Sequence, residues 1–155
     1  MAEVNDEENL KLKECLEKAK IIYERNKEIC CPYFQNKITL NSDGFNHLQN
    51  KPNRMPRNVN EQIFKLTLLK KALDILPKCG TLQEYRELLE KSGKSDRSGF
   101  YQMKKVQYWG FHAILNNKKL KIKVILRQVG DGKITFWSVM SDNRQKLYTD
   151  GIDED

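Results

Sequence analysis

The segment Leu120–Gln128 limits the fold more than any other part of the chain, because its charged and apolar side chains alternate with a period of two. In an extended strand, Lys121, Lys123, Ile125 and Arg127 fall on one face, and Ile122, Val124 and Leu126 fall on the other. A helix would mix the two sets, so the pattern predicts a β-strand with a buried face and a polar face. The turn residues Gly130–Gly132 follow and predict a hairpin.

This hairpin belongs to a longer basic segment, in which we predict three antiparallel strands over Val106–Leu115, Leu120–Gln128 and Lys133–Met140. Residues 100–140 contain eight Lys and Arg but a single acid, Asp131. Basic side chains spaced along one sheet face predict a surface that binds a polyanion such as nucleic acid. The alternative is charge that only keeps an exposed face soluble.

The 155 residues are enough for one domain with a buried core. We expect this domain to span residues 1–143 and residues 144–155 to form an acidic, loosely ordered tail. The net charge of +7 is unevenly placed, since residues 1–28 hold eight acids and six bases. The positive excess therefore lies in the middle of the chain and in the predicted sheet, which favours a localised binding surface.

The first third of the chain predicts a helix, a short strand and a loop. Apolar residues from Leu12 to Tyr23 recur at helical spacing and predict a helix over about residues 7–29. A short apolar segment, Lys37–Leu40, predicts a strand. The polar segment that follows predicts a turn and then a loop.

Two further helices are predicted before the basic strands. Asn58 is a candidate N-cap for a largely apolar helix that runs to about Leu76. Thr81 and Glu84 form a second capping box, which predicts a short helix to about Lys91. Helices and strands are thus separated along the chain, which predicts an α+β fold with helices on one face of a small antiparallel sheet and the other face open.

The predicted loop over residues 45–60 contains His47, Lys51, Arg54 and Arg57 but no acid. Histidine suits proton transfer because imidazoles titrate near neutrality. Arginine suits phosphate because its guanidinium donates two parallel hydrogen bonds. The alternative for His47 is a turn residue bonded to the backbone, and we favour a functional role because the loop has little apolar content.

The other candidate side chains lie in the basic strands. His112 shares a strand face with the apolar Val106 and Ile114, which predicts a core histidine. Trp109 and Trp137 have two interpretations, as stacking platforms for nucleobases or as core aromatics. Ser138 interrupts an apolar run. The lysines that we expect to contact nucleic acid are Lys51, Lys119 and Lys121.

We expect no metal and no cofactor. The four cysteines, Cys15, Cys30, Cys31 and Cys79, have no spacing typical of a metal site, and we expect reduced thiols. The chain contains neither of the common glycine-rich nucleotide-binding motifs. An acidic N-terminus without an apolar leader segment, and no apolar run of spanning length, predict a cytoplasmic protein with no membrane partner.

Several short motifs, taken in order, resemble the nuclease domains of phages and mobile elements that belong to the barnase–EndoU–colicin–RelE-like superfamily. The resemblance covers about residues 30–140. The motifs that carry it are G-F-x-H-L (Gly44–Leu48), K-P (Lys51-Pro52), the spaced Arg54 and Arg57, E-Y-R (Glu84–Arg86), Y-W (Tyr108-Trp109), K-V-I-L-R (Lys123–Arg127) and G-x-G-x-x-x-F-W-S-V (Gly130–Val139).

The resemblance implies N-terminal helices packed on a four-stranded antiparallel sheet whose open face binds RNA. It implies a toxin-like endoribonuclease that needs no metal, with His47 as the proton-transfer residue. Phosphate would be held by Arg54, Arg57, Lys123 and Arg127, and Ser138 would place a hydroxyl in the site. No second general acid is evident, so Lys123, an arginine or His112 assists, or the domain is not an efficient enzyme.

We therefore expect an endoribonuclease that cleaves RNA, such as a tRNA or mRNA, to a 2′,3′-cyclic phosphate by general acid–base catalysis. The first alternative is a nucleic-acid-binding module without catalysis. The second is a protein-interaction domain whose basic face binds an acidic partner, such as an antitoxin or an immunity protein.

Overall fold

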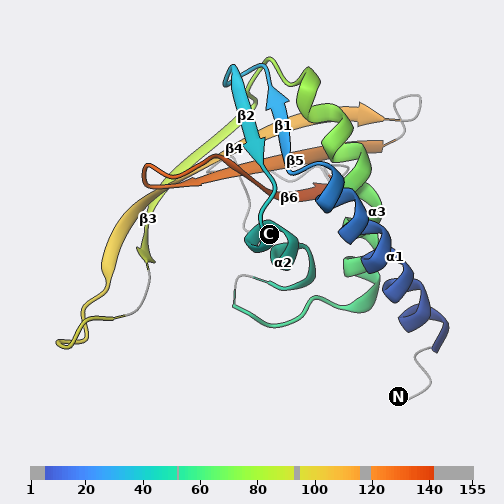
Figure 1. Ribbon diagram of the computed structural model, residues 1–155, viewed down its shortest axis with the longest axis horizontal. Coiled ribbons are helices and arrows are strands. Elements are labelled where there is room, and N and C mark those ends of the chain that lie inside the picture. The colour runs from blue at the N-terminus through green and yellow to red at the C-terminus, as the bar shows by residue number, and fades with distance from the viewer. Residues whose placement is uncertain (1–5, 52, 93–94, 116–119, 142–155) are drawn as a thin grey trace.

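The computed structural model describes residues 6–51, 53–92, 95–115 and 120–141 (Figure 1). Lys119 and the predicted acidic tail lie outside these residues. The described chain is α+β, as predicted. Its elements are α1 (Asp6–Arg25), β1 (Glu28–Cys31), β2 (Asn36–Thr39), α2 (Ser42–Gln49), α3 (Val59–Ile75), the 3-10 helix η1 (Leu76–Lys78), β3 (Glu84–Ser92), β4 (Gln102–Leu115), β5 (Leu120–Val129) and β6 (Thr135–Ser141).

The described strands form one six-stranded sheet in the order β1-β2-β6-β5-β4-β3. All neighbours are antiparallel except β2 and β6, which are parallel and meet at Thr39 and Thr135. The prediction of a four-stranded antiparallel sheet is therefore wrong in strand number and in sheet type. Strand β3 and the first half of β1 come from segments that were predicted to be helical.

The N-terminal helix is shorter than predicted. Helix α1 ends at Arg25, and the rest of the predicted helix enters β1, where Ile29 lies opposite Ile38 of β2. Cys31 at the end of β1 is fully buried. Burial of a β-branched residue and a small thiol in a strand pair outweighs one more turn of an exposed helix.

Strand β3 replaces the short helix predicted from the capping box at Thr81 and Glu84. Its sequence, EYRELLEKS, is rich in residues with high helix propensity. The whole of β3 pairs with β4, from Glu84 opposite Gly110 to Ser92 opposite Gln102, without a register shift. The nine-residue ladder thus overrides a propensity of a few tenths of a kcal/mol per residue.

The segment around His47 is also not the predicted loop. Asn41 caps α2 by accepting a hydrogen bond from the backbone N–H of Gly44 at 3.1 Å. A Cβ at Gly44 would clash with the carbonyl oxygen of Phe136 in β6, so only glycine allows this helix to approach the sheet so closely.

The core lies between one face of the sheet and the helices α1 and α3, which lie together on one side of the strands in Figure 1. The predicted period of two in β5 is confirmed, because Ile122, Val124 and Leu126 are fully buried against this core. Each such side chain contributes roughly 1.5–3 kcal/mol. The predicted cap is confirmed as well, since the Asn58 side chain accepts a hydrogen bond from the backbone N–H of Glu61 at 2.7 Å.

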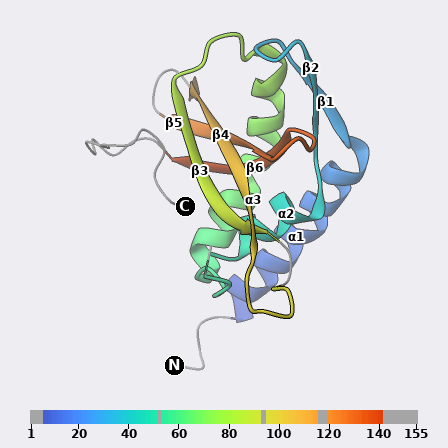
Figure 2. The same ribbon diagram turned by 90° about the vertical axis from the view of Figure 1, so that its left-hand side faces the viewer.

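Strands β3 and β4 bend away from the body and project as a long hairpin, at the lower left of Figure 1 and at the front of Figure 2. The predicted turn between β5 and β6 is confirmed, with Gly130 in the left-handed region at a φ of 55°. No helix in the described ranges is long and apolar enough to span a membrane.

Candidate functional site on the open sheet face

The face of β3–β6 opposite to α1 and α3 carries several polar side chains beside the buried Val106 and Ile125, and we call it the open face. Strand pairing brings residues from β3, β4 and β5 together there. Tyr108 of β4 lies opposite Arg127 of β5, and His112 lies opposite Lys123. Glu84 of β3 lies opposite Gly110 of β4, between these two pairs. The open face therefore combines cations, carboxylates and an imidazole from segments far apart in the sequence.

The first cluster on this face joins Glu84, His112 and Lys123. The Glu84 Oε2 atom lies 2.6 Å from His112 Nε2 and 3.0 Å from Lys123 Nζ. Lys123 Nζ also donates to Glu84 Oε1 at 3.3 Å. The Lys123 side chain is 1% exposed, Glu84 is 11% exposed and His112 is 37% exposed. The imidazole is thus the part of the cluster that solvent and ligands reach most easily.

The prediction that His112 is a core histidine is wrong. Its strand neighbours on the same face were identified correctly, but that face is the open one, and the imidazole is bonded to Glu84 instead of packing in the core. The backbone N–H of His112 donates to the Gln83 side chain at 3.0 Å. The error arose because the face of a strand that helices cover is a property of the whole sheet.

Gly110 provides the space in which this cluster lies. A Cβ atom at residue 110 would be 3.1 Å from the Cβ of Glu84, 3.3 Å from its Oε2 and 3.5 Å from the Cδ of Lys123. The two contacts with Glu84 are tighter than ordinary van der Waals packing, and the contact with Lys123 is at an ordinary distance. The missing side chain therefore lets the carboxylate and the lysine stem lie flat across β4.

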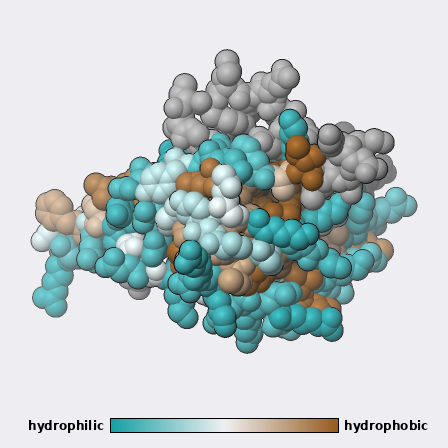
Figure 3. All heavy atoms as spheres, turned by 90° about the horizontal axis from the view of Figure 1, so that it is seen from above, coloured by the Kyte–Doolittle hydropathy of each residue, from teal (hydrophilic) through white to brown (hydrophobic). Residues whose placement is uncertain are grey.

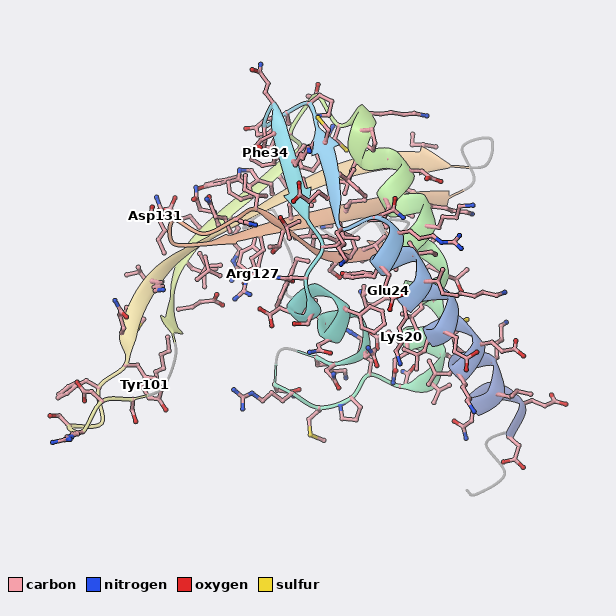
Figure 4. The ribbon with its side chains drawn as sticks, in the orientation of Figure 1. Lys20, Glu24, Phe34, Tyr101, Arg127 and Asp131 are labelled. Atoms are coloured by element: carbon pink, nitrogen blue, oxygen red, sulfur yellow. The ribbon has the colours of Figure 1, made fainter. Side chains whose placement is uncertain are left out.

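The second cluster surrounds Arg127. Its guanidinium carbon lies 4.2 Å from the centre of the Trp137 ring and 5.8 Å from that of Tyr108. Nη2 donates to Glu90 Oε2 over a long 3.4 Å, and the buried Nε–H has no partner among the described residues. In Figure 4 the Arg127 side chain extends from the strands toward the side on which α2 lies. Arg127 thus has hydrogen-bonding capacity that the described chain leaves unused.

Tyr108 borders the same cluster. Its hydroxyl donates to Glu90 Oε2 at 3.3 Å. Burial raises the pKa of Tyr108 above its ordinary value, and the nearby Arg127 lowers that pKa by a smaller amount. At neutral pH the phenol is therefore a hydrogen-bond donor, next to a guanidinium that is only weakly paired.

The Trp137 ring connects Arg127 to two further side chains, His47 and Arg57. The rings of Trp137 and His47 are stacked with centres 4.1 Å apart and planes 19° apart. His47 Nε2 lies 3.3 Å from Arg57 Nη2, and Arg57 Nε donates to the His47 carbonyl at 3.1 Å. Arg57 Nη1 also forms an ion pair with Glu61 at 3.1 Å.

This arrangement places two of the predicted site residues behind the open face. His47 is 6% exposed and Arg57 is 3% exposed. Both were predicted to act directly on RNA from a loop, whereas they connect α2 and the start of α3 to Trp137. Strand β5 lies on one side of β6 and α2 on the other (Figure 1), so Arg127 and His47 approach Trp137 from different sides.

The remaining predicted residues are scattered. Ser138 is fully buried, and its hydroxyl accepts from Lys65 Nζ of α3 at 3.4 Å. Trp109 lies on the core side, with its ring centre 4.9 Å from that of Phe34, so it is a core aromatic. Lys51 and Arg54 are exposed between α2 and α3, and Lys121 is exposed on the open face.

The sequence reasoning missed Glu84, Glu90 and Tyr108 as site residues, and it also missed the buried Lys65. Part of the β3 sequence carries a signal, because the charged Glu84, Arg86 and Glu90 share a parity, although Glu87 and Lys91 have the other. Read as a strand, this parity places their side chains on one face. The helix-favouring composition of the segment obscured that signal.

No family model, no curated protein and no solved structure matches this chain. Within the described residues, no group of three or more His, Cys, Asp or Glu side chains is arranged to hold a metal ion. The chemical interpretation therefore comes from the geometry of the open face.

Proposed function

We propose that the protein is a toxin-like endoribonuclease that cleaves RNA on the open face by general acid–base catalysis, without a metal ion, and leaves a 2′,3′-cyclic phosphate. One observation carries the proposal. The Glu84–His112 pair, at 2.6 Å, shares the face with Arg127, whose Nε–H has no partner among the described residues. The resemblance to the barnase–EndoU–colicin–RelE-like superfamily is a second support.

The reaction needs one proton acceptor and one proton donor. The 2′-oxygen attacks phosphorus as its proton leaves, and the bond to the 5′-oxygen breaks as that oxygen gains a proton. We assign the acceptor role to the Glu84 carboxylate and the donor role to the protonated imidazole of His112. Lys123 donates to both oxygens of Glu84, at 3.0 and 3.3 Å, and so orients the carboxylate.

Arg127 is the proposed phosphate ligand. Lys123 and Arg127 are four residues apart on β5, about 13 Å along the strand. Gly110 and Ile125 occupy opposite positions midway between the two clusters and are both buried. A phosphate bound by Arg127 would therefore lie beside this pair and not on it. The guanidinium of Arg127, whose side chain is 20% exposed, would then donate hydrogen bonds to the phosphate and stabilise the charge that builds on the phosphorus centre.

The predicted roles of His47 and Arg57 change in this proposal. Both are nearly inaccessible, and their contacts lead to Trp137. We therefore assign them to positioning Arg127 through the indole ring. Trp137, which was a candidate platform for a nucleobase, instead supports the guanidinium by a cation–π contact.

The test is cleavage of a labelled single-stranded RNA in EDTA, with wild type beside His112→Gln and Arg127→Ala. Loss of a proton-transfer group should lower the rate by roughly 10²–10⁴-fold. A matched control is Lys70→Ala, an exposed lysine of α3 on the other side of the sheet. Circular dichroism confirms that each variant is folded. Cyclic-phosphate ends that persist unchanged in His112→Gln would overturn the assignment.

A second candidate is RNA binding without cleavage. It is favoured by the ion pair of Lys123, which is 1% exposed and already bonded to Glu84, as in a purely structural contact. In that case RNA is retained intact, and its affinity falls with salt by about one unit of log–log slope for each phosphate contact. An acidic protein partner, such as an antitoxin or an immunity protein, would compete for the same face.

A further inference from the structure

Strand β3 is an edge of the sheet. It stands last in the strand order and has β4 as its one neighbour among the described strands. It is nine residues long, its register with β4 has no irregularity, and it contains no proline. Edge strands of soluble proteins are usually short, bulged or interrupted by proline, because a long regular edge presents unpaired N–H and C=O groups to other strands.

The hairpin that carries this edge is also unusually apolar on its surface. Leu89 is 66% exposed, Met103 is 50% exposed and Tyr85 is 40% exposed. They share the face of the hairpin that lies opposite to the open face. In Figure 3, hydrophobic atoms gather on the projecting left-hand part of the molecule, which is the hairpin of Figure 1. A long, regular edge beside exposed apolar side chains is typical of a surface that another strand covers.

We propose that β3 pairs with β3 of a second copy of this chain, in antiparallel orientation about a twofold axis perpendicular to the sheet. Such an axis keeps each side chain on its own side of the sheet. Residues directly opposite each other must also share a side, so their numbers must have the same parity. The axis therefore passes beside a residue and never between two residues, which leaves few registers to compare.

Charge and the number of paired residues together favour one of these registers. With the axis beside Leu88, Arg86 lies opposite Glu90 of the second copy, and Tyr85 lies opposite Lys91, each pair occurring twice. This register uses all nine residues of β3, from Glu84 to Ser92. Opposite charges facing each other across strands stabilise a sheet, and cations stack on aromatic rings.

The neighbouring registers are less favourable. An axis beside Glu87 places Glu87 opposite itself and Glu84 opposite Glu90. Axes beside Arg86 or Glu90 place like charges directly opposite each other, which destabilises strand pairing. An axis beside Leu89 also pairs opposite charges, Glu87 with Lys91, but it leaves Glu84 and Tyr85 without partners in β3 of the second copy. Both registers set one glutamate opposite a leucine, so the register at Leu88 is favoured by its greater length. The second copy is therefore the occupant that fits this edge, with the axis at Leu88.

The arrangement would extend the site. The perpendicular axis places the open faces of both copies on the same side of a continuous sheet. Arg86 of the second copy would reach Glu90, the carboxylate that accepts weakly from Arg127 at 3.4 Å and from Tyr108. Each copy would thus contribute a cation to the border of the other copy's Arg127 cluster.

The test is the mass in solution, measured by analytical ultracentrifugation over the micromolar range. This measurement does not depend on catalysis, so it is independent of the proposed function. Wild type is expected to be a dimer. Arg86→Glu places Glu opposite Glu90 twice and should raise the dissociation constant by at least about tenfold. Lys70→Glu makes the same change of charge on α3 and should remain dimeric.

Charge complementation tests the register itself. Arg86→Glu and Glu90→Arg chains should each be monomeric, and their mixture should form a one-to-one heterodimer, because both cross-strand pairs are again of opposite charge. If Glu90→Arg does not fold, Arg86→Glu beside Lys70→Glu still tests the proposal, because only Arg86→Glu should weaken the dimer. A monomeric wild type, or a dimer unaffected by Arg86→Glu, would overturn the proposal.

Discussion

Replacing Glu84 with glutamine should cost much more stability than an ordinary surface change. Lys123 is 1% exposed and lies 3.0 Å from the Glu84 carboxylate, which is 11% exposed. At this distance, with an effective dielectric constant of about 20, the Coulomb attraction is about 5.5 kcal/mol. The glutamine oxygen still accepts a hydrogen bond from the ammonium, so we expect a net loss of about 3 kcal/mol, at the lower end for a broken buried pair.

The assay is urea unfolding, followed by tryptophan fluorescence, with the denaturant slope compared between variants. The matched control is Glu28→Gln, because Glu28 pairs with Lys37 at 3.8 Å while both side chains are at least half exposed. That change should cost under about 0.5 kcal/mol. The double variant Glu84→Gln/Lys123→Met removes the unpaired charge and should recover most of the loss. Equal effects of Glu84→Gln and Glu28→Gln would refute the reasoning.

Three further predictions follow from glycine packing and from buried thiols. Gly110→Ala should displace the Glu84 carboxylate, destabilise the fold by about 1–3 kcal/mol and lower the rate of any RNA cleavage. The control is Gly80→Ala, whose new Cβ has nothing within 4 Å and should change neither the urea unfolding curve nor the cleavage rate. Burial raises the pKa of the Cys79 thiol from 9.0 to about 12. Above pH 9 the unfolded chain therefore loses this proton first, and urea titrations should show stability falling between pH 9 and 12 by up to about 1.4 kcal/mol per pH unit, less steeply in Cys79→Ala. The exposed Cys30 should react with a thiol reagent in the native protein and Cys79 only in urea, as mass spectrometry would show; equal labelling rates would contradict the burial of Cys79.

Local patterns in the sequence predicted several elements correctly. The alternation in β5 separated Ile122, Val124 and Leu126 from the basic side chains of the same strand. A strand turns successive side chains to opposite faces whatever surrounds it. The N-cap at Asn58 and the turn at Gly130–Gly132 are equally local. The Asn58 side chain accepts a hydrogen bond from the backbone three residues later, and Gly130 adopts a positive φ in the turn itself. These signals were enough to predict the α+β class.

Contacts between segments distant in the sequence decided the elements and site residues that local patterns did not predict. The residues of β3 favour a helix by propensity, and only pairing with β4 makes them a strand. That strand brings Glu84 to His112 and Lys123, so a histidine predicted to be in the core became part of the open face. The sequence by itself determined which side chains share a face. The tertiary structure alone decided which face the helices cover, because burial and cross-strand contacts depend on elements that one segment does not contain.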